Sequence, residues 1–167
     1  MLGTRPVELD QLIERRHALG QDLYDEVWEG VYHMAPEARL THAYLDDQVA
    51  IVLHPYARAA GLIGSGPFNL GEPGDFRVPD RGYHRDTFDA VYAPTAAIVV
   101  EILSPDDETF EKLPFYAARG VDEVIIADPD ERRVRILARS GDRYDDVDRS
   151  ALLGIDASSV AGEITWP

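Results

Sequence analysis

The sequence predicts an α/β fold of the α+β kind, with a central mixed β-sheet flanked by helices and extra antiparallel hairpins. Three observations lead to this prediction. Several stretches have the periodicity of amphipathic helices, residues 96–103 have the composition of a buried strand, and a region rich in glycine and proline precedes that strand. The length of 167 residues suits one domain, so we expect a single domain over residues 1–167.

A helix and then a hairpin are expected at the start of the chain. Residues 7–20 place leucine and isoleucine at helical spacing, and Gly20 should end the helix. Residues 22–36 are rich in aromatic and branched side chains on both sides of the pair Glu29-Gly30, which is typical of two strands joined by a turn.

The longest helical pattern covers residues 40–61. Thr41 is a candidate N-cap, and Pro55 should kink or shorten the helix because proline lacks the backbone N–H that a helix needs. The stripe of side chains that should face the core consists of Leu45, Val49, Val52 and Tyr56.

The rest of the chain should supply most of the sheet. Residues 61–80 predict short antiparallel strands with tight turns, and residues 96–103 predict the central strand. Residues 106–120 then predict a helix, with Pro114 inside it, and residues 122–147 predict a strand, a turn and a hairpin. The apolar residues of the tail that should pack on the core are Leu152, Leu153, Ile155 and Trp166.

Composition and charge narrow the class of protein. The chain has no cysteine, which excludes disulfides and thiolate metal sites and fits a reducing cytosol. It shows no membrane-spanning apolar run and no signal-peptide core, so we expect a cytoplasmic location and no membrane partner. The net charge of −15 provides no overall basic footprint, so a nucleic-acid partner would need a local patch or a bound cation.

An acidic residue lies inside the most apolar strand. Side chains of a strand alternate between faces, so Glu101 shares an apolar face with Val99 and Leu103. Because burial of an unpaired carboxylate is unfavourable, Glu101 needs a proton, an arginine or a metal ion beside it. The chain has 15 arginines, so an ordinary ion pair explains this residue as well as a metal does.

A second acid has the same layout. Phe76, Val78 and Asp80 would share one face of a strand, with Pro79 at its end or edge. If the two strands are neighbours, Asp80 and Glu101 converge, and their repulsion favours a shared divalent cation. Oxygen ligands alone favour Mg²⁺, Mn²⁺ or Ca²⁺ over zinc. The alternative for Asp80 is an ordinary turn aspartate after a proline.

The only lysine of the chain, Lys112, lies in the helix that should follow the Glu101 strand. Arginine cannot give up its proton, whereas a lysine near a metal site can have a lowered pKa and activate water. The alternative is a solvated helix residue that happens to be lysine, and Lys112 taken alone favours this alternative.

These residues belong to a longer pattern that resembles a known family. The sequence has a proline–aspartate pair at Asp80 and an E-x-L-S-P motif at Glu101. A K-L-x-x-Y-A-x-x-G-V motif follows from Lys112, and the next strand closes on aspartate–proline at Asp128. The order of these motifs resembles the PD-(D/E)XK nuclease superfamily and, more narrowly, the bacterial Uma-type family of predicted restriction endonucleases.

The resemblance implies a restriction-endonuclease-like fold. The nuclease-like core would span about residues 24–137, with the N-terminal helix and the C-terminal tail packed on it. The implied activity is that of an endonuclease dependent on Mg²⁺ or Mn²⁺, which hydrolyses phosphodiester bonds of nucleic acid, with DNA the expected substrate. Many nucleases of this superfamily act as dimers, so a homodimer is also expected.

The resemblance also assigns residues to roles. The implied catalytic side chains are Asp80, Glu101 and Lys112. The two acids would bind the metal with the backbone carbonyl of Ile102, and the lysine would activate water. Further candidates, from the first hairpin and the first core helix of the family, are Glu29 and His42.

Three departures from the pattern concern geometry. The superfamily usually places its lysine two residues after the second acid, which here is Leu103, so the role passes to Lys112 on the next helix. Arg81 follows Asp80 where the family has an apolar residue. Pro114 interrupts the lysine's helix and would shift its ammonium.

The sequence leaves open whether an arginine-rich strand face binds nucleic acid and whether the protein is an enzyme at all. Arg133, Arg135 and Arg139 share a strand face and would suit a phosphate backbone, unless they balance nearby acids on an exposed hairpin. A non-catalytic binding or interaction module on a nuclease fold is the second function considered, because fold does not fix function. No G-x-S-x-G, H-E-x-x-H or phosphate-loop motif supports another hydrolase.

Overall fold

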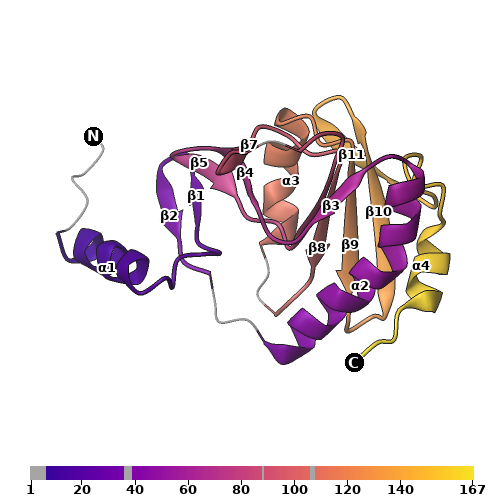
Figure 1. Ribbon diagram of the computed structural model, residues 1–167, viewed down its shortest axis with the longest axis horizontal. Coiled ribbons are helices and arrows are strands. Elements are labelled where there is room, and N and C mark those ends of the chain that lie inside the picture. Colours follow the sequence, from indigo (N-terminus) through magenta and orange to yellow (C-terminus); the bar gives the residue numbers. More distant parts are fainter. Residues whose placement is uncertain (1–6, 36–38, 88, 106–107) are drawn as a thin grey trace.

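Two β-sheets and four α-helices form the part of the chain that the computed structural model describes, which is residues 7–35, 39–87, 89–105 and 108–167 (Figure 1). The helices are α1 (Val7–Ala18), α2 (Leu40–Ala59), α3 (Thr109–Ala118) and α4 (Ala157–Glu163). The strands are β1 (Glu26–Trp28), β2 (Val31–His33), β3 (Ile63–Ser65), β4 (Asn69–Glu72), β5 (Asp75–Arg77), β6 (Arg81–His84), β7 (Tyr92–Ala93), β8 (Ile98–Ile102), β9 (Glu123–Asp128), β10 (Arg133–Ser140) and β11 (Arg143–Val147).

The larger sheet contains the predicted central strand. Its order is β11-β10-β9-β8-β6-β3, with β8 and β9 parallel and the other neighbours antiparallel. The smaller sheet has the order β2-β1-β5-β4-β7, with β4 and β7 parallel. Two mixed sheets with helices packed on them confirm the predicted fold class.

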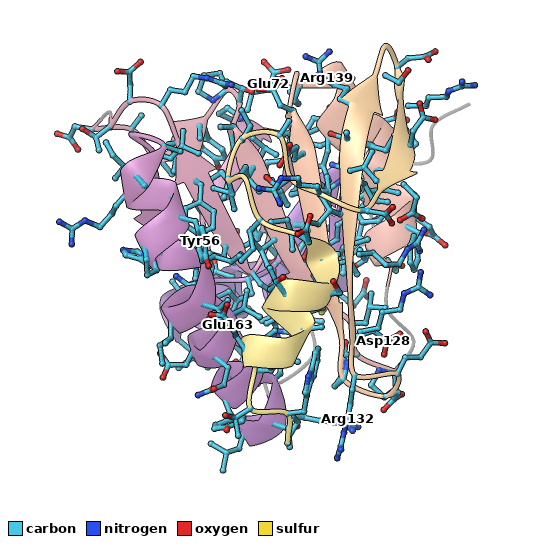
Figure 2. All side chains as sticks on the ribbon, turned by 90° about the vertical axis from the view of Figure 1, so that its right-hand side faces the viewer. Tyr56, Glu72, Asp128, Arg132, Arg139 and Glu163 are labelled. Carbon is cyan, nitrogen blue, oxygen red and sulfur yellow. The ribbon has the colours of Figure 1, made fainter. Side chains whose placement is uncertain are left out.

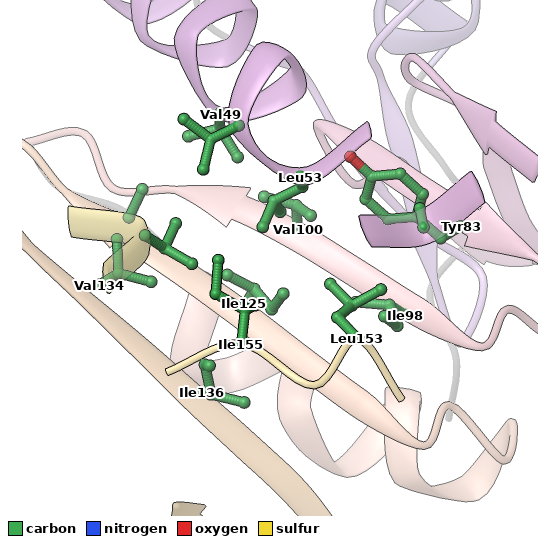
Figure 3. Packing of buried hydrophobic residues seen from close by; sticks show 14 of the residues in the cluster. Val49, Leu53, Tyr83, Ile98, Val100, Ile125, Val134, Ile136, Leu153 and Ile155 are labelled. Atoms are coloured by element: carbon green, nitrogen blue, oxygen red, sulfur yellow. The ribbon is translucent and has the colours of Figure 1, made fainter. Parts of the chain in front are cut away.

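Helices cover both faces of the larger sheet. α2 and α4 lie side by side over one face (Figure 2), and their apolar side chains pack against β8, β9 and β10 (Figure 3). In β8, Val100 and Ile102 belong to this layer, whereas Val99 packs on the opposite face with Tyr116 of α3. The predicted alternation is therefore confirmed, and it places Glu101 on the α3 side.

Two prolines lie inside helices without ending them. α2 continues through Pro55 for 20 residues in total, and α3 continues through Pro114. Each proline removes one backbone N–H, but both prolines are exposed, so water can bind the carbonyl that loses its partner. The predicted shortening at Pro55 and interruption at Pro114 are therefore wrong. Thr41 lies inside α2, whose N-cap residue is Arg39.

The N-terminal helix differs most from expectation. It forms where predicted, and Gly20 follows it with a φ of 64°, a left-handed conformation that suits glycine at a helix end. However, α1 contains no buried residue and lies apart from both sheets (Figure 1). Its expected packing on the core is not observed. An ion pair of 2.7 Å between Arg16 and Asp25 connects it to the start of the first hairpin.

The C-terminal tail packs on the larger sheet as predicted. Leu153 and Ile155 are buried, and Leu152 and Trp166 are partly buried against the same core. The tail also contains α4, which the sequence patterns do not reveal because its seven residues are too few for a clear periodicity. Within the described ranges, none of the helices has the length and apolar composition needed to cross a bilayer.

Candidate active site

The buried acid of the central strand lies where β8 meets α3. Glu101 is only 3% exposed. The Tyr116 hydroxyl donates a hydrogen bond to Glu101 Oε1, and the ammonium of Lys112 lies 3.5 Å from the same oxygen. Among the described residues its ion-pair partner is thus the single lysine rather than an arginine.

Lys112 joins the two sheets. Its Nζ lies 2.9 Å from Glu26 Oε1 in the smaller sheet and 3.5 Å from Glu101 Oε1 in the larger one. Its side chain is 14% exposed, so the alternative of a solvated helix residue does not apply. Because α3 is not interrupted at Pro114, the first turns of the helix carry the ammonium directly between the two acids.

Glu26 is the site residue that sequence reasoning missed. Trp28 Nε1 donates to its Oε2 at 2.6 Å, and the Val78 N–H donates to its Oε1 at 2.8 Å. Glu29, which was the hairpin candidate, lies exposed in the β1–β2 turn, where its own N–H donates to Asp75. The available signal was the alternation in Glu-Val-Trp, which places an acid on the same strand face as a tryptophan.

Asp80 lies directly before β6, which pairs with β8. Its Oδ2 accepts a hydrogen bond of 2.8 Å from the Ile102 N–H, so Asp80 lies beside the residue that follows Glu101. Its Oδ1 lies 2.9 Å from His42 Nε2 of α2. Asp80, Glu101, Lys112 and His42 are therefore brought together, and Glu29 is not.

Arg81, the departure from the family pattern, has a structural explanation. It follows Asp80 in the chain, and its guanidinium forms two hydrogen bonds with Asp46 of α2, at 2.9 Å and 2.7 Å. Such a bidentate pair is geometrically specific. Arg81 therefore holds the start of β6 against α2, and its charge is paired with Asp46.

The electrostatic balance of the site is negative. Burial raises the pKa of Glu101 to about 7, in spite of the attraction of Lys112, and the nearby charges of Asp80 and Glu26 add to the rise. Burial and the Glu101 charge also raise the pKa of Tyr116, so its hydroxyl stays a hydrogen-bond donor. One ammonium faces three carboxylates, which leaves negative charge for another cation to offset.

The pKa of Lys112 is raised in the metal-free protein. Burial acts to lower this pKa, but the attraction of Glu101 and Glu26 outweighs it, so the pKa is raised above its usual range. Without a metal ion the amine therefore keeps its proton, and Lys112 acts as a positive charge. A lowered pKa beside a bound metal stays a prediction.

The donor set fits a magnesium-like ion but is small. In the described part of the chain, no group of three or more His, Asp or Glu side chains is arranged to hold a metal. Mg²⁺ typically uses one or two carboxylates and keeps several waters. Asp80 and Glu101 meet that requirement. The Ile102 N–H points to Asp80, and in a strand the carbonyl of the same residue points to the same edge.

Arg77 packs the first hairpin against α3. It is 6% exposed, and its guanidinium carbon lies 4.4 Å from the Trp28 ring centre and 4.0 Å from that of Phe115. Its Nη1 donates to the Val27 carbonyl at 3.0 Å and to Asp75 at 3.1 Å. The cation between two rings holds together the two elements that carry Glu26 and Lys112.

Replacement of Arg77 by methionine should lower the free energy of unfolding by about 2 kcal/mol, because a desolvated cation–π contact is lost. Urea unfolding followed by tryptophan fluorescence measures this. The control is Arg119→Met, since Arg119 lies 5.1 Å from the Phe115 ring centre and is more exposed, with 22% of its side chain accessible. If both variants lost the same free energy of unfolding, the contact of Arg77 with the two rings would not stabilise the protein as argued here.

The arginine face of β10 is balanced by acids. Arg135 pairs with Asp146, and Arg139 Nη2 lies 3.1 Å from Asp122 Oδ1. Arg133 forms a longer ion pair, with its Nη1 3.7 Å from Glu131 Oε2. The alternative reading of this face, in which arginines offset neighbouring acids, is therefore the one that the geometry favours over an open phosphate track.

With this geometry in view, comparisons with known proteins define the class. Residues 9–158 match the Uma2 family, whose description is "Putative restriction endonuclease". The match covers most of the chain, so the chain belongs to the Uma2 family. This agrees with the resemblance seen in the motifs around Asp80, Glu101 and Lys112. No curated protein matches the chain.

One solved structure shows the same fold. The chain resembles the crystal structure of a "putative nuclease belonging to DUF820" from Anabaena variabilis, with a TM-score of 0.68 and 14% identity over 83% of this chain and 90% of that one. At this identity the likeness shows a shared fold. A DrdV–DNA complex aligns with 18% identity over 74% of this chain and 12% of that one, at a TM-score of only 0.36.

Proposed function

We propose that the protein is a divalent-metal-dependent endonuclease that hydrolyses phosphodiester bonds of DNA. The observation that carries the proposal is the meeting of Asp80, Glu101 and Lys112 at one end of β8. Asp80 is tied to the Ile102 N–H, and Lys112 lies 3.5 Å from Glu101. A buried acid, a second acid and a fixed cation at one point are the groups that this chemistry requires.

Different groups of the chain would bind the metal and orient its ligands. Asp80 and Glu101 would hold Mg²⁺ or Mn²⁺ through carboxylate oxygens, with the Ile102 carbonyl as a further ligand. The bound metal would polarise the phosphoryl group and lower the pKa of a coordinated water. His42 would orient Asp80, as residues behind metal ligands commonly do.

Lys112 would act through its charge. Its raised pKa keeps the ammonium protonated, so it would orient the attacking water or offset negative charge that develops on the phosphate. Glu26 holds it in place from the opposite side at 2.9 Å. This role requires a cation at a fixed position, and it does not require the amine to lose its proton.

The net charge of −15 affects how strongly the protein can bind DNA. Repulsion between an acidic chain and phosphates weakens binding, and the arginines of β10 are largely paired with acids. A metal bound between Asp80 and Glu101 would supply the missing local positive charge. We therefore expect weak DNA binding that depends on the metal and falls steeply with salt.

The direct test is cleavage of supercoiled plasmid with Mn²⁺, with chelator as the blank. Asp80→Asn should reduce the nicking rate by about 100-fold or more, because the site loses a metal-binding carboxylate. The control is Asp122→Asn, which removes a surface acid that pairs with Arg85 and Arg139 and should leave nicking unchanged.

A wild-type protein that binds Mn²⁺ and cuts none of supercoiled, linear or single-stranded DNA would instead be a non-catalytic module. If Asp80→Asn and the wild type nick at the same rate, the site proposed here is not the one that cuts.

A further inference from the structure

One oxygen of Glu101 makes both polar contacts that its side chain shows within the described part of the chain. The Tyr116 hydroxyl donates to Glu101 Oε1, and the Lys112 ammonium lies 3.5 Å from the same atom. A carboxylate oxygen has two lone pairs, so these two donors occupy the directions in which Oε1 could bind another partner. The observed contacts therefore leave Oε2 as the oxygen that can face a metal ion.

Tyr116 is the donor that fixes this arrangement. Its side chain is 0% exposed and packs with Val99 in the cluster of apolar side chains between α3 and the larger sheet. Close packing of this kind holds a side chain in one rotamer, so the hydroxyl has a fixed position. Lys112 is held more closely by Glu26, at 2.9 Å, than by Glu101. The tyrosine is thus the stronger restraint on the Glu101 carboxylate.

The other expected metal ligand is restricted in a similar way. Asp80 Oδ2 accepts a hydrogen bond of 2.8 Å from the Ile102 N–H, and Oδ1 lies 2.9 Å from His42 Nε2. Each oxygen of Asp80 therefore has one partner already. A site built from Asp80 and Glu101 offers few free lone pairs to an ion, so the release of one further oxygen would change its ligand set substantially.

The number of oxygens that a carboxylate offers affects which metal ion it binds. Ca²⁺ takes about six to eight oxygen ligands and often binds both oxygens of one carboxylate, whereas Mg²⁺ demands a near-ideal octahedron and keeps several waters. Mn²⁺ also suits octahedral sites of oxygen ligands. A glutamate that offers one oxygen therefore suits Mg²⁺ or Mn²⁺, and a glutamate that offers two would suit Ca²⁺ better.

We propose that Tyr116 sets the metal selectivity of the site, by restricting Glu101 to a single metal-binding oxygen, Oε2. The inference rests on the proposed function, since it takes Asp80 and Glu101 as the metal ligands. Tyr116 touches neither the metal nor the substrate. It is a positioning residue that acts through Glu101, and it makes the site discriminate against Ca²⁺.

The test measures metal affinities by isothermal titration calorimetry in the absence of DNA. The wild type should bind Mn²⁺ at least about 10-fold more tightly than Ca²⁺. In Tyr116→Phe, Oε1 becomes available to the ion, so this preference should fall by about 10-fold, mainly through tighter binding of Ca²⁺. Glu101→Gln should lose the binding, which assigns the measured ion to this site.

A second buried tyrosine provides the matched control. Tyr83 of β6 is also 0% exposed, and its hydroxyl has no hydrogen-bond partner among the described residues. Tyr83→Phe removes the same group from the same sheet and should leave the ratio of Mn²⁺ to Ca²⁺ affinity as in the wild type. A purely structural effect of Tyr116→Phe would weaken the binding of both ions equally and leave that ratio unchanged.

The stability of the variant does not limit the test. Urea unfolding shows whether Tyr116→Phe is folded under the conditions of the titration. The preference of the wild type for Mn²⁺ is measured without any substitution, so it tests the proposal even if the variant unfolds.

Three results would overturn the proposal. The first is a wild type that binds Ca²⁺ as tightly as Mn²⁺, and the second is a folded Tyr116→Phe whose affinity ratio equals that of the wild type. The third is a Glu101→Gln protein that still binds Mn²⁺ normally, which would also contradict the metal site of the proposed nuclease. The expected selectivities in a protein that cleaves no DNA would support the role of Tyr116 and contradict the proposed function alone.

Discussion

Lys112→Met should reduce Mn²⁺-dependent nicking by about 1,000-fold, within the range seen when a positioned catalytic group is removed. The same change should lower the free energy of unfolding by about 3–5 kcal/mol, because Glu26 and Glu101 lose the cation between them. Plasmid nicking and urea unfolding at pH 8 measure the two effects.

A second variant separates the two roles of this residue. Lys112→Arg keeps a permanent positive charge, so it should recover much of the lost stability and part of the activity. If the amine acted as a base, the arginine variant would be as inactive as the methionine variant. Nicking by Lys112→Arg that is no faster than by Lys112→Met, in a protein that is stably folded, would contradict the role as a fixed charge.

Glu101→Gln should abolish metal-dependent cleavage and at the same time stabilise the metal-free protein at high pH. Burial raises the pKa of Glu101 from 4.5 in the unfolded chain to about 7 in the folded one. A raised folded pKa contributes stability that is fully present below pH 4.5 and is lost as pH rises through 7. The wild type is therefore penalised at pH 8, and the neutral amide removes that penalty.

The size of the effect follows from the shift. A difference of about two to three pKa units corresponds to roughly 3 kcal/mol at pH 8, and the difference between the two proteins should vanish near pH 4.5. Urea unfolding in the presence of chelator, over pH 4.5 to 8.5, measures this. A wild-type protein whose advantage grows with pH would show that Glu101 is not destabilised by its burial.

A second buried glutamate provides the matched control. Glu123 is also 3% exposed, but it accepts hydrogen bonds from the N–H groups of Ala151 and Leu152 and from the Ser150 hydroxyl. Glu123→Gln puts an amide nitrogen where these donors need an acceptor, so it should destabilise the protein. Opposite signs at two equally buried glutamates would distinguish a functional acid from a structural one.

Much of the site was predictable because strand alternation and motif spacing act over short distances. The alternation of Val99, Glu101 and Leu103 fixed the face on which the acid lies, and the motif order linked it to Asp80 and Lys112. These predictions needed only one strand and the helix after it. The strand expected to carry Asp80 is wrong, because β5 ends at Arg77 in the smaller sheet. Asp80 reaches β8 because it directly precedes β6, which pairs with β8.

The missed features depend on contacts between distant segments. Glu26 becomes a site residue only because the first hairpin packs against α3, 86 positions along the chain, and no local pattern encodes that contact. The raised pKa of Lys112 depends on the same hairpin. Likewise, the exposure of α1 was not predictable, because an amphipathic pattern indicates an apolar face without saying which partner covers it.

The sharing of one ammonium by acids of two sheets constrains how this protein can evolve. A lineage that loses Lys112 leaves the carboxylates of Glu26 and Glu101 without the cation between them, which lowers the stability of the fold. Loss of the lysine should therefore be accompanied by change at Glu26 or Glu101, so descendants without the lysine should differ at these positions as a set. Selection for folding would therefore retain Lys112 even apart from its proposed role in catalysis.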